Sequence, residues 1–227
     1  MASASTAARQ QAASHADRRL GKYALFALYG FMVLYVLQHN ERFLIDPAHP
    51  AWQHYESFKW WLLPHGIAGA CAIFLGPMQF SDRLRQRYTK LHRVLGRVYV
   101  GGALIAAPLG AYIQYFQERM GLPRSFSIAG AADAALWWTT TLIAFAFILK
   151  GNVRMHRQWM TRSLVVASVF LQVRVITGLM GVDNNPASIE TAVWSCLAFA
   201  VLASDVIIYW QELTARRPQP RTAVAGD

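Results

Sequence analysis

The sequence predicts an all-α integral membrane protein with six transmembrane helices and both termini on the cytoplasmic side. First, 55% of the 227 residues are hydrophobic and only 15% are charged, whereas soluble domains carry about 25% charged residues. Second, the apolar residues form blocks close to the ~20 residues that a helix needs to cross a bilayer. Third, the basic residues gather between alternate blocks. This composition excludes a disordered chain, a fibrous repeat and most soluble enzymes.

The apolar blocks place the expected elements along the chain. Residues 1–21 are polar and basic and lack the apolar core of a signal peptide, so we expect a disordered cytoplasmic tail. The six expected spans are residues 22–38, 59–80, 92–116, 130–149, 159–180 and 190–210. They make a transmembrane domain over residues 22–210, and residues 211–227 form a second expected disordered cytoplasmic tail. The spans are expected to be helices because strands of a membrane barrel would alternate polar and apolar residues.

The distribution of lysine and arginine predicts the orientation. With the N-terminus inside, 17 of the 22 basic residues fall in cytoplasmic segments, four fall in outer segments, and Arg174 alone lies within a span. Positive charge favours the cytoplasmic side of a membrane protein. We therefore expect both termini in the cytoplasm and the protein in the cytoplasmic (inner) membrane of a bacterium. Because these charges lie between apolar blocks, the expected partner is the lipid bilayer and not nucleic acid.

Small residues indicate where helices pack closely. Gly102, Ala106 and Gly110 recur at four-residue spacing in the third span, and Gly66 and Gly69 lie in the second. Rows of small residues let the backbones of neighbouring helices approach each other. We expect spans two to five to form the core bundle, with spans one and six at its flanks.

Polar residues within spans mark candidate sites, because a central charge costs roughly 2.5–3.5 kcal/mol on insertion scales. His65, Asp133 and Arg174 each lie toward the outer end of a span and can share one layer. Asp133 and Arg174 can form a structural ion pair that lowers the cost of both charges. Alternatively, the three residues form a pocket for a substrate or for proton handling. The sequence leaves both interpretations open.

A second layer is expected at the inner surface, where two segments place a His-Arg pair at the start of a span. These segments are LHRVLGR at 91–97 and MHRQWMTR at 155–162, so His92 and His156 lie at about the same height. Two histidines at one height on facing helices match bis-imidazole ligation of a haem iron. Gly96 lies one turn from His92 and leaves room for a flat ligand. The arginines that can meet the haem propionates are Arg93, Arg97, Arg157 and Arg162.

Two other interpretations of the inner layer stay open. Histidine and arginine at inner helix starts also bind lipid phosphates. The layer can also hold another metal or a small ligand. For zinc, His92 and His156 are too few ligands, and Asp82 or Asp205 would have to join them.

Two longer segments carry a family resemblance. They are PHGIAGACAIFLGPMQF with LRQRYTKLHRVLGRVY, within residues 64–99, and HRQWMTRS at 156–163. Together they resemble a family of predicted bacterial multi-pass membrane proteins of unknown function. The chain is more distantly similar to transmembrane b-type cytochromes of the ascorbate-reducible or ferric-reductase kind.

The cytochrome resemblance implies a four-helix core with paired histidines, one pair on the second and fourth spans and one on the third and fifth. His92 and His156 match the third-and-fifth pair, and His65 matches a ligand on the second span. The fourth span has no histidine. The resemblance therefore implies one inner haem b, with His65 free for contact with a quinol or substrate.

The leading functional hypothesis is a membrane-embedded electron-transfer protein whose b-haem iron is held by His92 and His156. It would exchange electrons with a quinol, a small reductant or a partner protein, which makes it a candidate membrane oxidoreductase. One alternative is a small-solute or ion carrier without a cofactor, with a polar path through the spans. Another is a non-enzymatic accessory subunit of a membrane complex. A homo-oligomer is a further candidate assembly.

Overall fold

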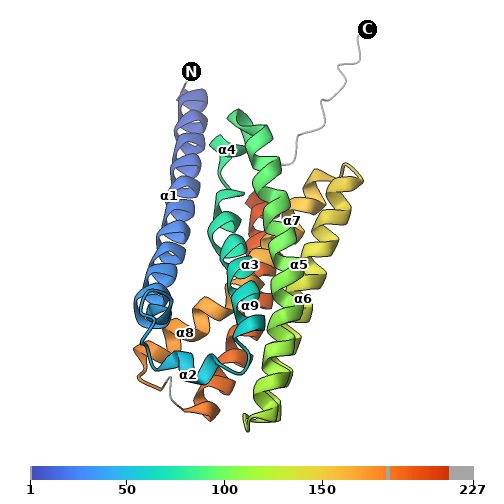
Figure 1. The fold of residues 1–227 in the computed structure, drawn as a ribbon. Coiled ribbons are helices and arrows are strands. Elements are labelled where there is room, and N and C mark those ends of the chain that lie inside the picture. The colour runs from blue at the N-terminus through green and yellow to red at the C-terminus, as the bar shows by residue number, and fades with distance from the viewer. Residues whose placement is uncertain (1, 183–184, 215–227) are drawn as a thin grey trace.

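The computed structural model describes the backbone of residues 2–182 and 185–214, and the side chains from residue 20 to residue 210 within those ranges. This part of the chain is helical and holds no strand (Figure 1). Its elements, in order, are α1 (Ala2–His39), η1 (Arg42–Leu44), α2 (Ala51–Tyr55), α3 (Lys59–Met78), α4 (Asp82–Arg87), α5 (Thr89–Arg119), α6 (Arg124–Leu149), α7 (Val153–Ala167), α8 (Val169–Leu179) and α9 (Pro186–Thr214).

The prediction of six transmembrane helices is confirmed. Six helical stretches are long and apolar enough to cross a membrane: Leu20–His39, Lys59–Met78, Thr89–Arg119, Arg124–Leu149, Val153–Leu179 and Pro186–Trp210. Two ends differ from the expected tails. The α1 helix begins at Ala2, so it covers most of the segment 1–21 that the sequence predicts to be disordered. The α9 helix continues to Thr214, and the rest of the expected tail 211–227 lies outside the described residues.

Several helix ends have a local cause in the sequence. Gly121, Gly151 and Gly181 follow α5, α6 and α8 with φ values of +106°, +72° and +65°. Glycine adopts this left-handed conformation without the steric cost of a Cβ atom, and it commonly ends helices in this way. At the N-terminus of α7, the Asn152 side chain accepts a hydrogen bond from the Met155 amide (3.1 Å). These glycine and asparagine residues end one helix and start the next, so that successive spans can run antiparallel.

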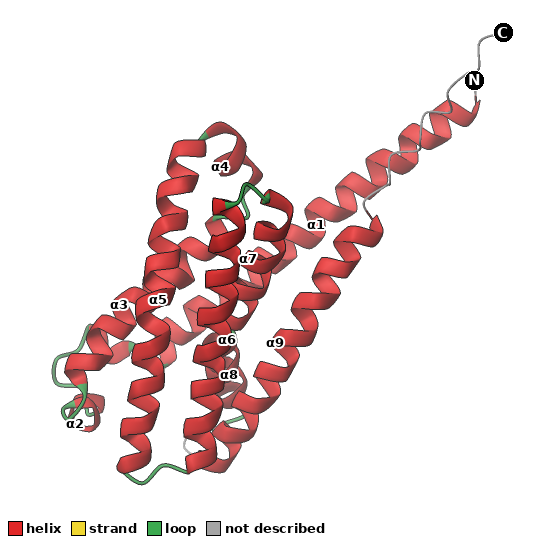
Figure 2. Ribbon diagram, turned by 90° about the vertical axis from the view of Figure 1, so that its right-hand side faces the viewer, coloured by secondary structure: helices red, strands yellow, loops and turns green. Residues whose placement is uncertain are grey.

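Four helices form the central bundle: α3, α5, α6 and α7. Their shared core consists of Ala68, Ala72, Tyr99, Ala103, Ala106, Ala107, Trp137, Ala144, Met160, Val166 and Ala167. The α9 helix packs on α6, α7 and α8, and α1 packs on α8. Figure 2 shows α1 and α9 diverging from α5, α6 and α7 toward the two chain ends. Spans two to five thus make the core, as predicted, with the first and last spans outside it.

The bundle has two distinct ends. The start of α1, the end of α9, α4 and the turn between α6 and α7 lie at one end, which we call the terminus end (Figure 1). The opposite end carries η1, α2 and the turns that follow α5 and α8, and we call it the loop end (Figure 1). The positive-inside prediction makes the terminus end cytoplasmic.

The small residues predicted to allow close packing do so between α3 and α5. A Cβ atom on Gly102 would lie 2.6 Å from the backbone oxygen of Ala68, and one on Gly110 would lie 2.9 Å from Cε1 of His65. The contact at Gly102 is with backbone, which cannot rotate away as a side chain can. Gly102 is therefore required for the approach of the two helices.

We expect Gly102→Val to lower the free energy of unfolding by about 1–3 kcal/mol, the usual cost of overpacking a close interface. Gly101→Val is the matched control, because a Cβ atom on Gly101 meets nothing within 4 Å. Thermal unfolding of both variants in detergent measures the difference. Equal midpoints for the two variants would contradict the close-packing argument.

The fifth span is broken at Ser168. The α7 helix ends at Ala167 and α8 begins at Val169. The Ser168 hydroxyl donates to the carbonyl of Val165 (2.6 Å) and accepts from Nε2 of Gln172 (2.8 Å). A serine side chain that bonds to the preceding turn competes with the backbone ladder and bends helices. As a result α7 stays in the core bundle, while α8 packs on α1 and α9.

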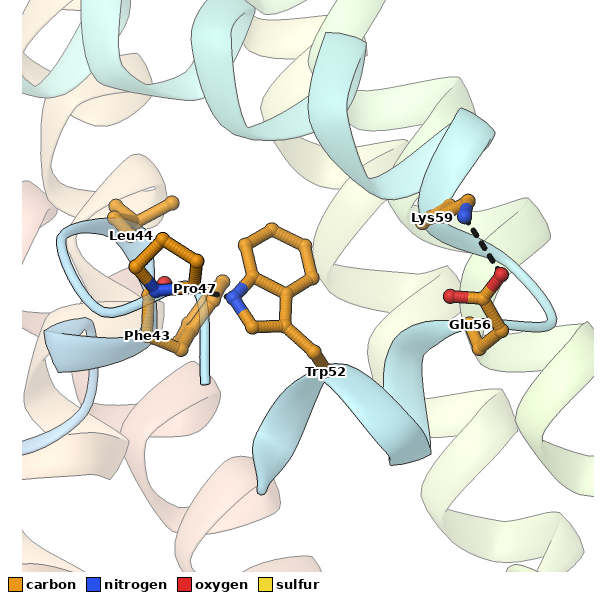
Figure 3. A pocket seen from close by; sticks show the side chains of 6 residues that line it. All are labelled: Phe43, Leu44, Pro47, Trp52, Glu56 and Lys59. Atoms are coloured by element: carbon orange, nitrogen blue, oxygen red, sulfur yellow. Dashed lines mark hydrogen bonds and ion pairs between the residues drawn. The ribbon is translucent and has the colours of Figure 1, made fainter. Parts of the chain in front are cut away.

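Residues 40–58 form an ordered aromatic cap over the loop end. Phe43 and Phe58 are buried, and the Phe43 and Trp52 rings meet edge to face at 5.2 Å. Nε1 of Trp52 donates to the Phe43 carbonyl (2.9 Å). Figure 3 shows the hollow beside this pair, about 380 Å³ in volume, which the ion pair between Lys59 and Glu56 (2.6 Å) flanks.

The three histidines of this outer segment each have a local contact. His39 stacks on the Tyr35 ring at 4.1 Å, Nδ1 of His49 accepts from the Ala51 amide (3.2 Å), and His54 packs against Phe58 at 5.8 Å. Within the described residues, no group of three or more His, Cys, Asp or Glu side chains could hold a metal ion.

Candidate functional site

The terminus end holds the two histidines that the sequence pairs. His92 lies in the first turn of α5 and His156 in the first turn of α7, so both occupy the same end of the central bundle. Neither helix follows the other directly, because α6 connects them and packs on both. The two imidazoles nevertheless lie within electrostatic range of each other. The fold therefore brings together two side chains that stand 64 residues apart in the sequence.

The orientation of His156 is fixed by a backbone hydrogen bond. Its Nδ1 atom lies 2.8 Å from the carbonyl oxygen of Ala144 on α6. A carbonyl only accepts, so Nδ1 carries the proton, and in the neutral ring Nε2 keeps its lone pair. Metal-bound histidines are typically oriented in this way, with the second nitrogen donating to a carbonyl or carboxylate. His156 thus presents a nitrogen that can act as a ligand.

No comparable hydrogen bond fixes the orientation of His92. Its Nδ1 atom is buried and has no hydrogen-bond partner. Nε2 of the buried Gln79, at the end of α3, also has no partner. The Oε1 atom of Gln79 lies 3.2 Å from the position that a Cβ atom on Gly96 would take. The space beside Gly96, which the sequence predicts to be open for a flat ligand, therefore holds the Gln79 side chain. Buried polar atoms without partners are uncommon and need an explanation such as a missing ligand or water.

The predicted anion-binding arginines line the outside of this end. Arg93, Arg97 and Arg157 are exposed. Nearby, Nζ of Lys22 on α1 pairs with Asp82 of α4 (2.7 Å). This hydrogen bond, with the charges of Arg85 and Arg157, holds the pKa of the Asp82 carboxyl below its usual range despite some burial. The surface around the two histidines is consequently rich in positive charge.

The three residues predicted to share an outer layer serve three separate interfaces. His65 of α3 donates from Nδ1 to the Ala106 carbonyl of α5 (2.8 Å) and rests against Gly110. Asp133 of α6 lies within electrostatic range of Cys196 of α9, and its buried Oδ1 has no hydrogen-bond partner. No ion pair joins Asp133 to Arg174 among the side chains that the structure describes. The described contacts of the three side chains therefore lie with different helices, and a shared pocket stays a prediction.

Arg174 instead faces the aromatic cap. Its guanidinium lies over the Phe170 ring at 5.3 Å, and its charge reaches Glu41 and Tyr55. Burial raises the pKa of the Glu41 carboxyl, and the positive charge of Arg174 opposes that rise. Arg174 on α8 is therefore electrostatically linked to the connection between α1 and η1.

We expect Arg174→Gln to make the stability of the protein more sensitive to pH. A carboxyl whose pKa is raised by folding stabilises the fold below its unfolded pKa, and this contribution is lost as pH rises through the folded pKa. Without Arg174 the folded pKa of Glu41 rises further, so stability falls more between acidic and neutral pH. Thermal midpoints from pH 4 to 8 measure the effect. In a Glu41→Gln background the extra pH dependence should vanish, and its persistence there would contradict this assignment.

A closed ring of hydrogen bonds in the middle of the bundle was not predicted. The Thr141 hydroxyl donates to the Trp137 carbonyl (2.7 Å) and lies 2.7 Å from the Ser163 hydroxyl, which lies 2.7 Å from the Tyr99 hydroxyl. Nε1 of Trp137 donates to that tyrosine oxygen (3.4 Å). Since Thr141 uses its proton on the carbonyl, Ser163 donates to Thr141 and Tyr99 donates to Ser163. Each hydroxyl thus donates once, and the ring begins and ends at Trp137.

This hydroxyl ring joins α5, α6 and α7 at the level of the membrane centre. Tyr99, Thr141 and Ser163 are fully buried, and each lies about 12–15 Å from its helix end at 1.5 Å per residue. The sequence does contain a pattern that indicates this ring, because three hydroxyl residues occupy apolar spans at one depth. With every donor satisfied, the ring holds the core together and offers no open site.

The comparisons with known proteins give a family and no activity. The family model described as "Predicted membrane protein (DUF2306)" matches residues 62–208, which run from α3 to the last turns of α9. No curated protein matches the chain, and no solved structure does.

Proposed function

The chain belongs to the DUF2306 family of predicted membrane proteins, and we propose that it is an electron-transfer protein of the membrane. In this proposal a b-type haem is bound at the terminus end by His92 and His156. The observation that carries it is the His156 imidazole, whose bond to the Ala144 carbonyl (2.8 Å) leaves Nε2 ready to ligate, within electrostatic range of His92.

The residues around the two histidines offer contacts for the proposed haem. Two buried nitrogen atoms, Nδ1 of His92 and Nε2 of Gln79, have no partner, so this end of the bundle has unused hydrogen-bonding capacity. The exposed guanidinium groups of Arg93, Arg97 and Arg157 can meet the propionates. Gln79 must move from beside Gly96 to admit a flat group, and its unpartnered amide can then donate to that group. The haem would supply one-electron oxidation and reduction.

An absorption spectrum of the detergent-extracted protein tests the proposal. We expect a Soret band that shifts on reduction, with roughly one haem for each chain. The protein should be expressed with added haem precursor, so that supply does not limit loading. A colourless protein with full helical content would overturn the proposal.

A second candidate is a small-solute or ion carrier, which the break at Ser168 favours. Transporter sites are often built where a transmembrane helix is interrupted, and in the fifth span the single turn residue Ser168 separates α7 from α8. Arg174 lies on the α8 half and is the basic residue within that half-span. Solute uptake into vesicles that is abolished by Arg174→Ala, with a colourless protein, would favour this carrier over the haem protein.

A further inference from the structure

A groove lies on the surface of the bundle between α7 and α9. It has a volume of about 540 Å³ and is lined by Gln158 and Arg162 of α7 and by Asp205, Val206, Tyr209 and Trp210 of α9. Val206, Tyr209 and Trp210 are about two-thirds exposed, at 66%, 64% and 66%. In a spanning helix such apolar side chains face the acyl chains, so the groove opens to the bilayer.

An ion pair forms the polar part of this groove. Nε and Nη2 of Arg162 donate to the same oxygen, Oδ1 of Asp205, at 2.9 and 2.6 Å. The guanidinium also lies over the Trp159 ring at 4.9 Å. The second carboxylate oxygen, Oδ2, takes no hydrogen bond within the described residues, and 60% of the Asp205 side chain is exposed. The pair is neutral as a whole and keeps one strong acceptor uncovered.

The depth of this pair makes that acceptor unusual. Asp205 lies nine residues before the end of α9 and Arg162 nine residues after the start of α7, so each lies about 14 Å from its helix end at 1.5 Å per residue. Acyl chains at this depth offer no hydrogen bond. Ionisable residues that face the hydrocarbon are rare and mark functional sites.

The chemistry of the groove restricts its occupant. The occupant must enter from the bilayer, carry no net charge, donate to Oδ2 of Asp205 and accept from the guanidinium. A phosphate head group fails because the ion pair is already neutral as a whole and offers no net positive charge to a phosphate. A quinol ring fits, since its hydroxyls can donate to Oδ2 and accept from the guanidinium, and its flat face matches the aromatic wall of Tyr209 and Trp210. The volume lies within the roughly 300–1,000 Å³ of small-molecule sites.

We propose that this groove binds the head group of a lipid-soluble quinol, the reduced form of a quinone. The proposal names the partner class of the redox function proposed above and rests on it, although binding itself can be measured in the absence of haem. His156 lies six residues before Arg162 on the same helix, a rise of about 9 Å. The groove therefore lies close to the histidine pair along α7.

Photolabelling tests the groove directly. The full chain in phosphatidylcholine nanodiscs is exposed, without oxygen, to an azido-substituted benzoquinol with a short isoprenoid tail, and the labelled peptides are mapped by mass spectrometry. We expect saturable labelling confined to α7 and α9 that excess unlabelled quinol displaces. Asp205→Asn should weaken labelling at least tenfold, whereas Asp82→Asn, the same change at an ion pair outside the groove, should leave it unchanged.

A second variant separates lost binding from lost folding. Val206 is exposed, so Val206→Trp should fill the groove, spare the ion pair and still abolish labelling. Labelling that spreads over all helices without saturation would overturn the quinol site. Labelling that persists in both Asp205→Asn and Val206→Trp would overturn it as well. Saturable labelling of a colourless protein would uphold the site and reject the haem, whereas a haem spectrum without labelling would reject the site alone.

Discussion

His156→Ala is expected to remove the Soret absorbance of the purified protein, to below about a tenth of the wild-type value per chain. His92 and His156 would together hold the proposed haem, and the alanine removes the histidine whose orientation the Ala144 carbonyl fixes (2.8 Å). Ligating histidines depend on such second contacts for their orientation. The absorption spectrum of the variant, normalised to protein, measures the loss, and His92→Ala should give the same result.

Two controls distinguish ligand loss from misfolding. His65→Ala removes a histidine that also donates to a backbone carbonyl across two helices, yet it lies toward the loop end and should keep the full band. Added imidazole should restore part of the band in His156→Ala, because it can enter the space that the ring leaves. A normal spectrum in His156→Ala, or equal losses in His65→Ala, would contradict the assignment of the ligands.

The number and position of the spans could be predicted because they follow from composition along one dimension. An apolar run of sufficient length is a helix in a membrane whatever its neighbours are. The break at Ser168 does not follow from composition. The segment around it, LVVASVFLQV, holds no proline or glycine, and the serine hydroxyl bends the helix through its contacts with Val165 and Gln172. Those contacts exist only in the folded chain.

The sequence predicts how deep each candidate residue lies along its helix, but it does not predict toward which neighbouring helix the side chain points. Counting residues from a helix end places His92 and His156 in one layer, and the structure brings them within electrostatic range. The same count places His65, Asp133 and Arg174 in one layer, but these side chains point to different neighbours. Which way a helix faces depends on packing with all adjacent helices. Single polar residues in apolar spans do not carry that information.

The hydroxyl ring shows why the central polar contact could not be predicted from the sequence. Charged residues in spans are conspicuous because their transfer into lipid is costly. The transfer of serine and threonine into lipid costs less free energy, since their hydroxyls can donate a hydrogen bond to a carbonyl of their own helix, as Thr141 does to Trp137. Their function as links between helices appears only when Tyr99 and Ser163 are placed beside them.

Tyr99→Phe is expected to lower the free energy of unfolding by about 1–2 kcal/mol, the cost of leaving a buried donor without a partner inside a membrane bundle. The substitution keeps the fully buried ring and removes one hydroxyl. Nε1 of Trp137 then loses its acceptor, and Ser163 loses its donor. Reversible unfolding in mixed detergent measures the change. Tyr115→Phe is the matched control, because its hydroxyl accepts only an exposed bond from Arg119, and its effect should stay within about 0.5 kcal/mol.

A double-mutant cycle tests whether the four residues act as one ring. Thr141→Val breaks the ring at the link opposite Tyr99, so its cost should overlap with that of Tyr99→Phe. The double variant should therefore lose less stability than the sum of the two single variants, by about 0.5 kcal/mol or more. Hydrogen bonds in a chain polarise one another, and once one link is broken the next contributes less. Strictly additive losses would mean that the hydroxyls bond in pairs, and the inferred proton order from Trp137 through Tyr99 and Ser163 to Thr141 would then be wrong.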